Sequence, residues 1–315
     1  WALKMQNKND KAYDAFYKSI WNEAWQHAGF LNLARLAVSK KAYDDALSFI
    51  DKSLIKNYHS HTARHLKVVI LRKLGKAAEA MQLIGESLDI DPFNYGCLFE
   101  KAILEEKTAG RGDAARNQLL ERSRNWVHHF IEYAFDYAHA GLFEEAIHLL
   151  SFHAEEDENP YPMKYYYLGW FASQLQDMNR AAGYFSQAAS AKADYCFSNR
   201  IEDVPVLQKA IGFNPSDSKA FYYLGNFWYD KRQYADAIDC WEQSVRADNS
   251  FPTVKRNLSL AYYNKLNDPA KALVSLEEAF SLDEADARIL MELDQLRKKL
   301  GRPAALRLFI LEEYL

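Results

Sequence analysis

Residues 221–245 read FYYLGNFWYDKRQYADAIDCWEQSV and carry eight aromatic side chains within one short stretch. The first half of the stretch has apolar or small residues at spacings of three, four and seven: Phe221, Leu224, Gly225 and Trp228. Those spacings place the side chains on one face of a helix. After the turn YDKRQ, Ala237 and Trp241 lie four residues apart and begin a second helical pattern. The stretch therefore predicts two amphipathic helices joined by a tight turn.

The second-helix pattern, a small residue followed four positions later by a large one, recurs along the chain. It is found at Ala12 with Phe16, Ala46 with Ile50, Ala80 with Ile84, at Ala114, at Ala146 with Leu150, Ala181 with Phe185, Ala237 with Trp241, and Ala272 with Leu276. Most of the intervals are 32 to 35 residues. A fixed period of this length indicates a repeat architecture, in which each helix pair buries its apolar face against the next.

This pattern resembles the tetratricopeptide repeat (TPR), W-x2-L-G-x2-Y followed by A-x3-F and then Pro. The unit that begins at Phe221 fits best, and units at Tyr165 and Phe30 also fit. The segment 98–118 fits poorly, because Lys101, Glu105 and Gln118 occupy positions that the family makes apolar. The resemblance spans essentially the whole chain. It implies an all-α fold, a right-handed superhelical α-solenoid of antiparallel helix pairs.

The period is interrupted once. From Ala188 to Ala210 the interval is 22 residues, so that about one helix is missing. The intervening DYCFSNRIEDVP contains Asp203 and Pro205, which favour a loop or a shortened helix. We therefore predict N-terminal TPR-like repeats at 1–194, an irregular shortened repeat at 195–210 and C-terminal TPR repeats at 211–315.

The overall composition narrows the class of function. The net charge of −4 argues against a nucleic-acid-binding protein, and no apolar run is long enough to span a bilayer. Three cysteines without a CxxC pair imply no disulfide framework and favour a reducing, cytoplasmic location. Because the chain begins with Trp1 and not with Met, we expect a segment upstream of it.

Motifs for catalysis or cofactor binding are not found in the sequence, which has no GxGxxG, P-loop, GxSxG or HExxH. His59, His61 and His65 form the nearest metal-like cluster, but they lack a Cys or carboxylate partner at a suitable spacing. The alternative is that they belong to a solvated helix start. Cys196 has no neighbouring His that would activate a thiol. We therefore expect no enzyme, no metal and no cofactor.

A narrower resemblance rests on the phrases FYKSIWNEAW, YPMKYYYLGW and FPTVKRNLSLAYYNK. They are similar to the C-terminal TPR region of large uncharacterised bacterial proteins, in which a β-rich, sugar-enzyme-like region precedes the repeats. This resemblance implies that a catalytic or sugar-binding part, if present, lies outside these residues. It also raises an alternative function, that of a non-catalytic accessory region which contributes to sugar binding.

The TPR resemblance implies a binding surface as well, because first helices of successive units line a concave groove in that family. Consensus positions such as Phe221, Trp228 and Trp241 are occupied by packing, so the other first-helix residues should face the groove. The predicted groove residues are Phe135, Tyr166, Trp170, Gln174, Tyr222, Asn226, Tyr229, Arg256, Asn257 and Tyr263. They predict a protein-interaction scaffold for a peptide or partner domain, including the protein's own upstream region, with carbohydrate as the alternative. A further alternative is that these rings contact one another and bind nothing.

Peptide-binding members of the family use Asn where Asn226 and Asn257 stand, and Arg288 falls near a third such place. The Lys of the family's carboxylate clamp is replaced by Tyr222, and Glu292 stands where a second cation is needed. The resemblance therefore argues against a clamp for a C-terminal carboxylate. Because the generic repeat also has Asn at both positions, a purely structural role for the two amides stays open.

Overall fold

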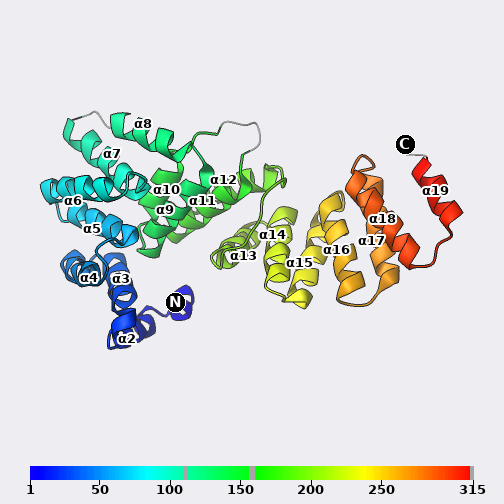
Figure 1. The fold of residues 1–315 in the computed structure, drawn as a ribbon, viewed down its shortest axis with the longest axis horizontal. Helices are drawn as coiled ribbons and strands as arrows, with labels where there is room; N and C mark the ends of the chain where they lie inside the picture. The colour runs from blue at the N-terminus through cyan, green and yellow to red at the C-terminus, as the bar shows by residue number, and fades with distance from the viewer. Residues whose placement is uncertain (110–112, 156–159, 313–315) are drawn as a thin grey trace. The chain divides into compact units, whose positions relative to one another are not determined.

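A computed structural model describes residues 1–109, 113–155 and 160–312, and within these ranges all the regular secondary structure is helix, with no strand (Figure 1). The predicted all-α solenoid of antiparallel helix pairs is confirmed. Contacts group the chain into two compact units. Unit 1 comprises Trp1–Glu158 and Phe171–Met178, and unit 2 comprises Asn159–Trp170 and Asn179–Leu315. The helix α11 (Pro162–Gln174) therefore contributes to both.

Unit 1 is built from helix pairs in which neighbours in sequence pack together, as α3 with α4, α5 with α6, α7 with α8 and α9 with α10. Its helices are α1 (Ala2–Met5), α2 (Asn9–Ser19), α3 (Glu23–Ser39), α4 (Tyr43–Lys56), α5 (His61–Lys73), α6 (Ala77–Ile90), α7 (Tyr95–Ala109), α8 (Asp113–Ser123), α9 (Val127–His139) and α10 (Phe143–Leu150).

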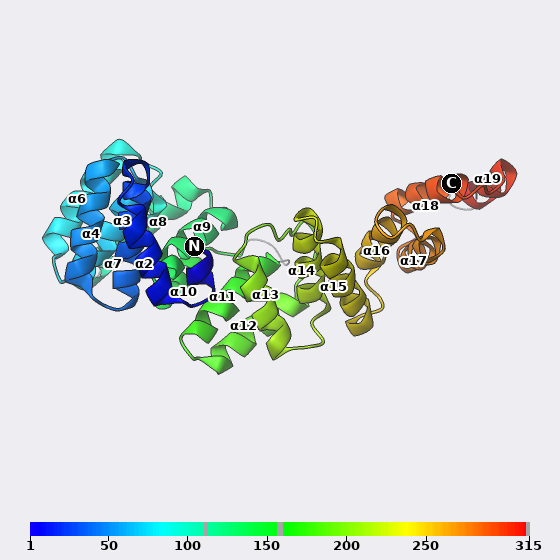
Figure 2. The same cartoon turned by 90° about the horizontal axis from the view of Figure 1, so that it is seen from below.

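Unit 2 contains the best-matching repeats, and α14 packs on α15 as α16 packs on α17 (Figure 2). Its helices, besides part of α11, are α12 (Met178–Ser190), α13 (Asp203–Phe213), α14 (Ser218–Asp230), α15 (Tyr234–Ala247), α16 (Pro252–Asn264), α17 (Pro269–Leu282), α18 (Ala287–Lys299) and α19 (Ala304–Glu312). None of the helices in the described part of either unit is long and apolar enough to cross a membrane.

The repeat's small residues are where the two helices of a pair approach most closely. A Cβ added at Gly225 in α14 would lie 2.5 Å from Trp241 Nε1 in α15. One at Gly169 in α11 would lie 2.6 Å from the Phe185 ring in α12. The large residue of the second helix thus occupies the space above the glycine of the first, and Ala237 beside it is fully buried.

The predicted repeat position at Ala114 is wrong by one residue. Ala114 is exposed, whereas Ala115 and Leu119 are buried, so the small–large pair of α8 is Ala115 with Leu119. One helical residue turns the side chain by about 100°, enough to move it off the packed face. The polar residues of α7 that fitted poorly, Lys101 and Glu105, form an ion pair at 3.8 Å that is partly exposed to solvent.

Residues 191–202 form no helix, and α13 follows them as a second helix without a first. This segment lies within unit 2, whereas the contacts divide the chain near residue 159 and inside α11. A boundary at 195–210 between N-terminal and C-terminal repeats therefore stays a prediction.

Side-chain contacts hold the irregular segment in place. Asp203 is fully buried and accepts hydrogen bonds from the backbone N–H groups of Asn199 and Arg200, at 2.9 and 3.0 Å. It also accepts one from the Tyr167 hydroxyl of α11 at 2.6 Å. Burial raises the pKa of Asp203, and the Tyr167 hydrogen bond opposes that rise. The carboxylate thus supplies the acceptor for two backbone N–H groups that lie outside any helix.

Candidate functional site

A pocket of about 260 Å³ opens between α14, α15 and α16. It is lined by Asn226, Tyr229 and Asp230 of α14, Trp241 of α15, and Asn257 and Leu260 of α16. Three of the predicted groove residues, Asn226, Tyr229 and Asn257, therefore meet at one place in unit 2. They come together because α14 and α16 are the first helices of successive pairs, and the side chains of Asn226 and Asn257 hydrogen-bond across them.

Aromatic rings form one wall of the pocket. The Tyr229 ring lies 5.2 Å from the Trp241 ring, tilted by 33°, and 5.2 Å from the Tyr234 ring. Trp241 is almost fully buried, whereas Tyr229 is partly exposed. Packing on both sides therefore fixes the Tyr229 ring while leaving part of its surface open to a ligand.

Asn226 is held at the centre of a hydrogen-bond network. Its Oδ1 accepts from Trp241 Nε1 at 3.1 Å and from Asn257 Nδ2 at 3.3 Å. The Tyr222 phenol also forms a hydrogen bond with Asn226. That bond lowers the pKa of Tyr222, but burial raises it more, so the net shift is upward. These contacts set the orientation of the Asn226 amide.

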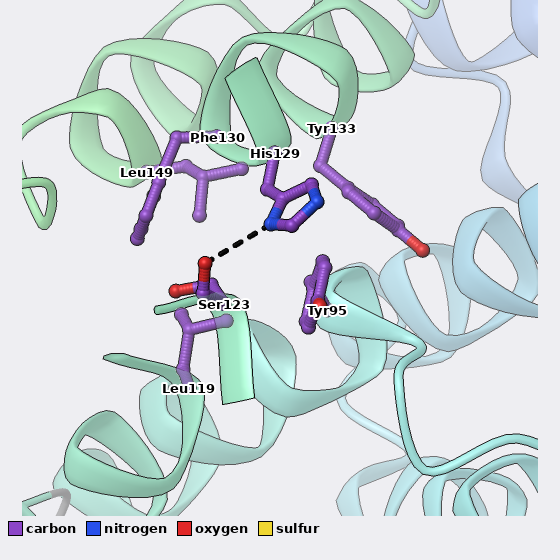
Figure 3. Close-up of a pocket in the computed structure, with 7 residues that line it drawn as sticks. All are labelled: Tyr95, Leu119, Ser123, His129, Phe130, Tyr133 and Leu149. Atoms are coloured by element: carbon purple, nitrogen blue, oxygen red, sulfur yellow. Dashed lines mark hydrogen bonds between the residues drawn. The ribbon is translucent and has the colours of Figure 1, made fainter. Parts of the chain in front are cut away.

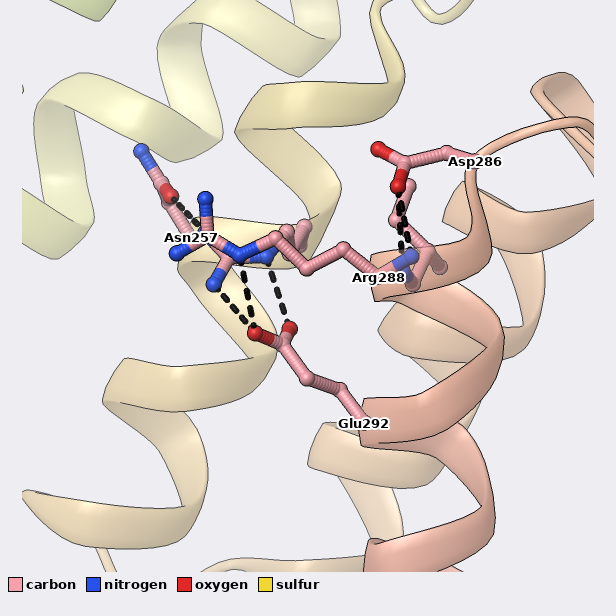
Figure 4. Close-up of polar contacts among 6 residues, drawn as sticks. Asn257, Asp286, Arg288 and Glu292 are labelled. Carbon is pink, nitrogen blue, oxygen red and sulfur yellow. Dashed lines mark hydrogen bonds and ion pairs between the residues drawn. The ribbon is translucent and has the colours of Figure 1, made fainter.

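Asn257 links this network to a charged cluster (Figure 4). Its Oδ1 accepts from Arg256 Nη1 at 3.4 Å, and Arg256 donates to both carboxylate oxygens of Glu292 in α18. The amide of Asn257 is therefore aligned from both ends.

The contacts leave Asn257 with unused hydrogen-bonding capacity. A side-chain amide has two N–H donors and two acceptor lone pairs. Asn257 uses one donor on Asn226 and one acceptor on Arg256, and its side chain is partly exposed in the pocket. One donor and one acceptor remain, the pair that complements a peptide unit.

Three other predicted groove residues are buried, so the expectation that they face the groove is wrong in this respect. Phe135 packs at 5.6 Å on Phe171, and the Tyr166 hydroxyl donates to Asp217 at 3.0 Å. Tyr222 packs at 4.9 Å on Phe251, the residue that precedes α16. Helices of the neighbouring repeat cover these rings, since a solenoid packs the first helix of one repeat against the first helix of the next as well as against its own partner helix.

The remaining predicted residues lie outside the pocket lining. Gln174 is exposed in unit 1, and Trp170 is partly buried in unit 2. The Tyr263 ring has Lys299 Nζ 5.1 Å from its centroid.

The prediction also missed some lining residues. Trp241 was assigned to packing alone, yet its indole lines the pocket and bonds Asn226. Asp230 and Leu260 follow Asn226 and Asn257 along their helices by four and three residues. That helical spacing is the signal that would have found them.

A second space, in unit 1, is lined by Tyr95, Leu119, Ser123, His129, Phe130, Tyr133 and Leu149 (Figure 3). His129 Nδ1 is 3.1 Å from the Ser123 carbonyl oxygen, and the His129 ring packs 4.9 Å from Tyr95. The space leaves no room for a water-sized molecule. It is therefore a packed cluster of aromatic and aliphatic side chains from α7, α8, α9 and α10.

A third pocket, of about 550 Å³, is lined by Arg72, Ile103, Glu106, Glu144, Glu145 and His148. Beneath it, Arg72 donates to both oxygens of the fully buried Glu100 at 2.5 and 3.0 Å. Tyr137 donates to the same carboxylate at 2.5 Å, and Arg72 also contacts Glu145 at 3.4 Å. Burial is the largest single influence and lowers the pKa of Arg72, but Glu100, Tyr137 and Glu145 together outweigh it, so the net shift is upward. The network joins α5, α7, α9 and α10 and has a structural role.

The histidine cluster is not brought together. His65 is buried in α5 and packs edge-on against Tyr137 at 4.8 Å, so it does not belong to a solvated helix start. His61 lies 3.6 Å from Asp91. Among the residues that the structure describes, no group of three or more His, Cys, Asp or Glu side chains could hold a metal ion.

No family model matches the chain. Among solved structures, it is similar to YrrB, a TPR protein with an unusual peptide-binding site, at 14% identity over 77% of this chain and 96% of that chain, with a TM-score of 0.29. It is similar to a chain of the APC/C hetero-tetramer Cut9–Hcn1 at 16% identity over 81% and 52%, with a TM-score of 0.29. It is also similar to MamA at 21% identity over 58% and 95%, with a TM-score of 0.29. At these identities and scores the matches carry no conclusion about ligands. The resemblance to proteins with a sugar-enzyme-like region stays a prediction.

Proposed function

We propose that this protein is a non-catalytic interaction scaffold, and that the pocket between α14, α15 and α16 binds an extended peptide segment of a protein partner. The peptide's backbone pairs with the Asn257 amide, and one of its side chains packs on the Tyr229 ring. Leu260 supplies the apolar surface on the opposite side.

One observation carries the proposal: Asn257 keeps a free donor and a free acceptor while Asn226 and Arg256 hold it in place. An amide that is already oriented loses little side-chain entropy when it pairs with a ligand, so each hydrogen bond contributes more to affinity. A neighbouring tyrosine ring adds contact area with few rotatable bonds, as in energetically dominant residues of protein interfaces.

A random dodecapeptide phage library selected on the full chain tests this proposal. The selected peptides, synthesised with blocked termini, are titrated against the wild type and the Asn257→Ala and Tyr229→Ala variants. Each substitution should weaken binding about tenfold, since a lost hydrogen bond or aromatic contact at an interface contributes about 1–2 kcal/mol.

Asn264→Ala is the matched control, because Asn264 is exposed on the same helix, donates to the Leu260 carbonyl at 2.9 Å and does not line the pocket. It should leave affinity unchanged. Equal binding by all the variants would place the peptide elsewhere. If no peptide is selected and a glycan array instead gives binding that Tyr229→Ala abolishes, the pocket binds carbohydrate and the peptide proposal fails.

A further inference from the structure

Two arginines converge on a single carboxylate at the Asn257 end of the pocket (Figure 4). Arg256 of α16 donates to Glu292 of α18 through Nε at 2.7 Å and through Nη2 at 2.5 Å. Arg288, one turn before Glu292 on α18, adds a third contact through Nε at 3.3 Å. The Asp286 carboxylate lies close by and accepts from the backbone N–H groups of Arg288 and Ile289.

The Arg256–Glu292 pair is largely removed from water. The Arg256 side chain is 12% exposed and that of Glu292 is 19% exposed, whereas Arg288 is 67% exposed. A bidentate guanidinium–carboxylate pair that is shielded from solvent is strong and geometrically specific. Arg288 in turn lies at the rim, where solvent screens its charge.

Removal of the Glu292 carboxylate would leave a mostly buried guanidinium beside the pocket, because no other carboxylate among the described residues pairs with Arg256. The planar fork of an arginine matches a carboxylate, so such a site would attract a C-terminal carboxylate or an acidic side chain. In the protein as it stands, Glu292 already fills that place.

A carboxylate of the protein also lines the pocket itself. Asp230 lines it and pairs with the exposed Lys231 at 2.7 Å. A ligand carboxylate in the pocket would therefore lie near the Asp230 carboxylate and would find Arg256 already paired with Glu292.

We propose that Glu292 determines ligand specificity by acting as an internal carboxylate. It occupies the Arg256–Arg288 site, so that the pocket rejects peptides through their C-terminal carboxylate or acidic side chains and accepts neutral or basic segments. The inference rests on the proposed peptide-binding function, but the occupied arginine site is testable by itself.

Acetate is the direct probe of the site. The thermal unfolding midpoint of the full chain is measured as sodium acetate replaces sodium chloride at constant ionic strength. The wild type should show no acetate-dependent shift. Glu292→Ala should show an upward shift that saturates, because a ligand that binds only the folded state raises the midpoint. The double variant Glu292→Ala/Arg256→Ala should lose that shift.

A second measurement uses a random hexapeptide pool prepared with free and with amidated C-termini, captured on the immobilised chain and quantified by mass spectrometry. The wild type should favour the amidated pool, and Glu292→Ala should enrich the free-acid pool about tenfold relative to wild type, as expected for one charge-assisted pair.

Glu277→Ala is the matched control, since Glu277 pairs with Arg297 at 2.9 Å and does not line the pocket. It should behave as the wild type in both experiments. The inference is overturned if Glu292→Ala gains neither acetate stabilisation nor free-acid peptides, or if the wild type itself prefers the free-acid pool. An acetate response in Glu292→Ala with no peptide captured by any variant would uphold Glu292 as the internal carboxylate and refute the peptide-binding function.

Discussion

The closest packing in the repeat depends on single residues, and Gly225 is the clearest case. Its hydrogen faces the Trp241 indole, which also bonds the Tyr222 carbonyl at 3.3 Å and the Asn226 side chain. The residue that packs the helix pair thus also orients the pocket amide. Repeat packing and the candidate site are coupled through this one tryptophan.

Gly225→Ala should destabilise unit 2 by about 2–3 kcal/mol, because the new methyl overlaps Trp241 and a packed core resists expansion. Urea denaturation followed by circular dichroism measures the change. Gly183→Ala is the matched control: Gly183 lies in α12 with no atom within 4 Å of an added Cβ, so alanine there should be neutral or stabilise the helix by up to about 1 kcal/mol. Equal effects at both sites would refute this account.

Buried phenols should make the protein sensitive to alkaline pH. Burial, reinforced by the Asp217 and Asp203 carboxylates, raises the pKa values of Tyr166 and Tyr167 well above their usual range. The folded state keeps both phenols protonated, whereas the unfolded chain ionises near pH 10. Their contribution to stability is therefore complete below about pH 10 and is lost as the pH rises through the raised values.

Absorbance at 295 nm and far-ultraviolet circular dichroism, recorded together from pH 8 to 13, measure this effect. A group of tyrosines should ionise only as helical signal is lost. Complete ionisation of all the tyrosines with native circular dichroism would contradict the prediction.

At the scale of elements, the irregular segment 191–202 shows how a solenoid accommodates a missing helix. Tyr195 and Phe197 of this segment are exposed, whereas Cys196 and Ser198 are buried, and Ser198 donates to the Tyr223 carbonyl. The loop therefore inserts alternate side chains into the space that a first helix would fill. Asp203 is its main polar anchor.

Asp203→Ala should release this segment, because two backbone N–H groups and the buried Tyr167 hydroxyl lose their acceptor, at a cost of about 2–4 kcal/mol. Limited chymotrypsin digestion should cut at Tyr195 or Phe197 many times faster than in the wild type. Asp239→Ala is the control, since Asp239 is exposed on α15 and accepts from Gln243 one turn later on the same helix. Unchanged cleavage in Asp203→Ala would show that apolar contacts hold the loop.

At the scale of the whole molecule, contacts group the chain into two units, and most helices pack on their neighbours in sequence. Stability in such a chain is approximately a sum of local terms. A destabilising substitution should therefore increase local unfolding in the adjacent helix pairs and leave more distant pairs unchanged.

Hydrogen exchange measured by mass spectrometry tests this locality. Glu100→Ala leaves the buried Arg72 guanidinium without its bidentate partner, which should cost about 3–5 kcal/mol and speed exchange in α5, α7, α9 and α10. Exchange in α14–α17 should stay at the wild-type rate. Gly225→Ala should give the opposite pattern. Faster exchange in both units from either change would show that the molecule unfolds as one cooperative block.

The sequence by itself determined the helix pairs, their period and most of the core alanines, because helical periodicity is a local property and repeats across the chain. It also located Asn226, Tyr229 and Asn257 on one surface. The error at Ala114 marks the limit of this approach, since one residue of register decides which side is buried.

Only the tertiary structure decided which of the predicted groove residues are accessible and what they bond. In the repeat pattern Tyr166 and Tyr222 share a helix face with the position of Tyr229, yet adjacent helices and Phe251 cover them. Asn226 and Asn257 are 31 residues apart and Arg256 and Glu292 are 36 apart. Such pairs form only when successive repeats stack, because a repeat pattern specifies the face of each helix and not the side-chain contacts between repeats.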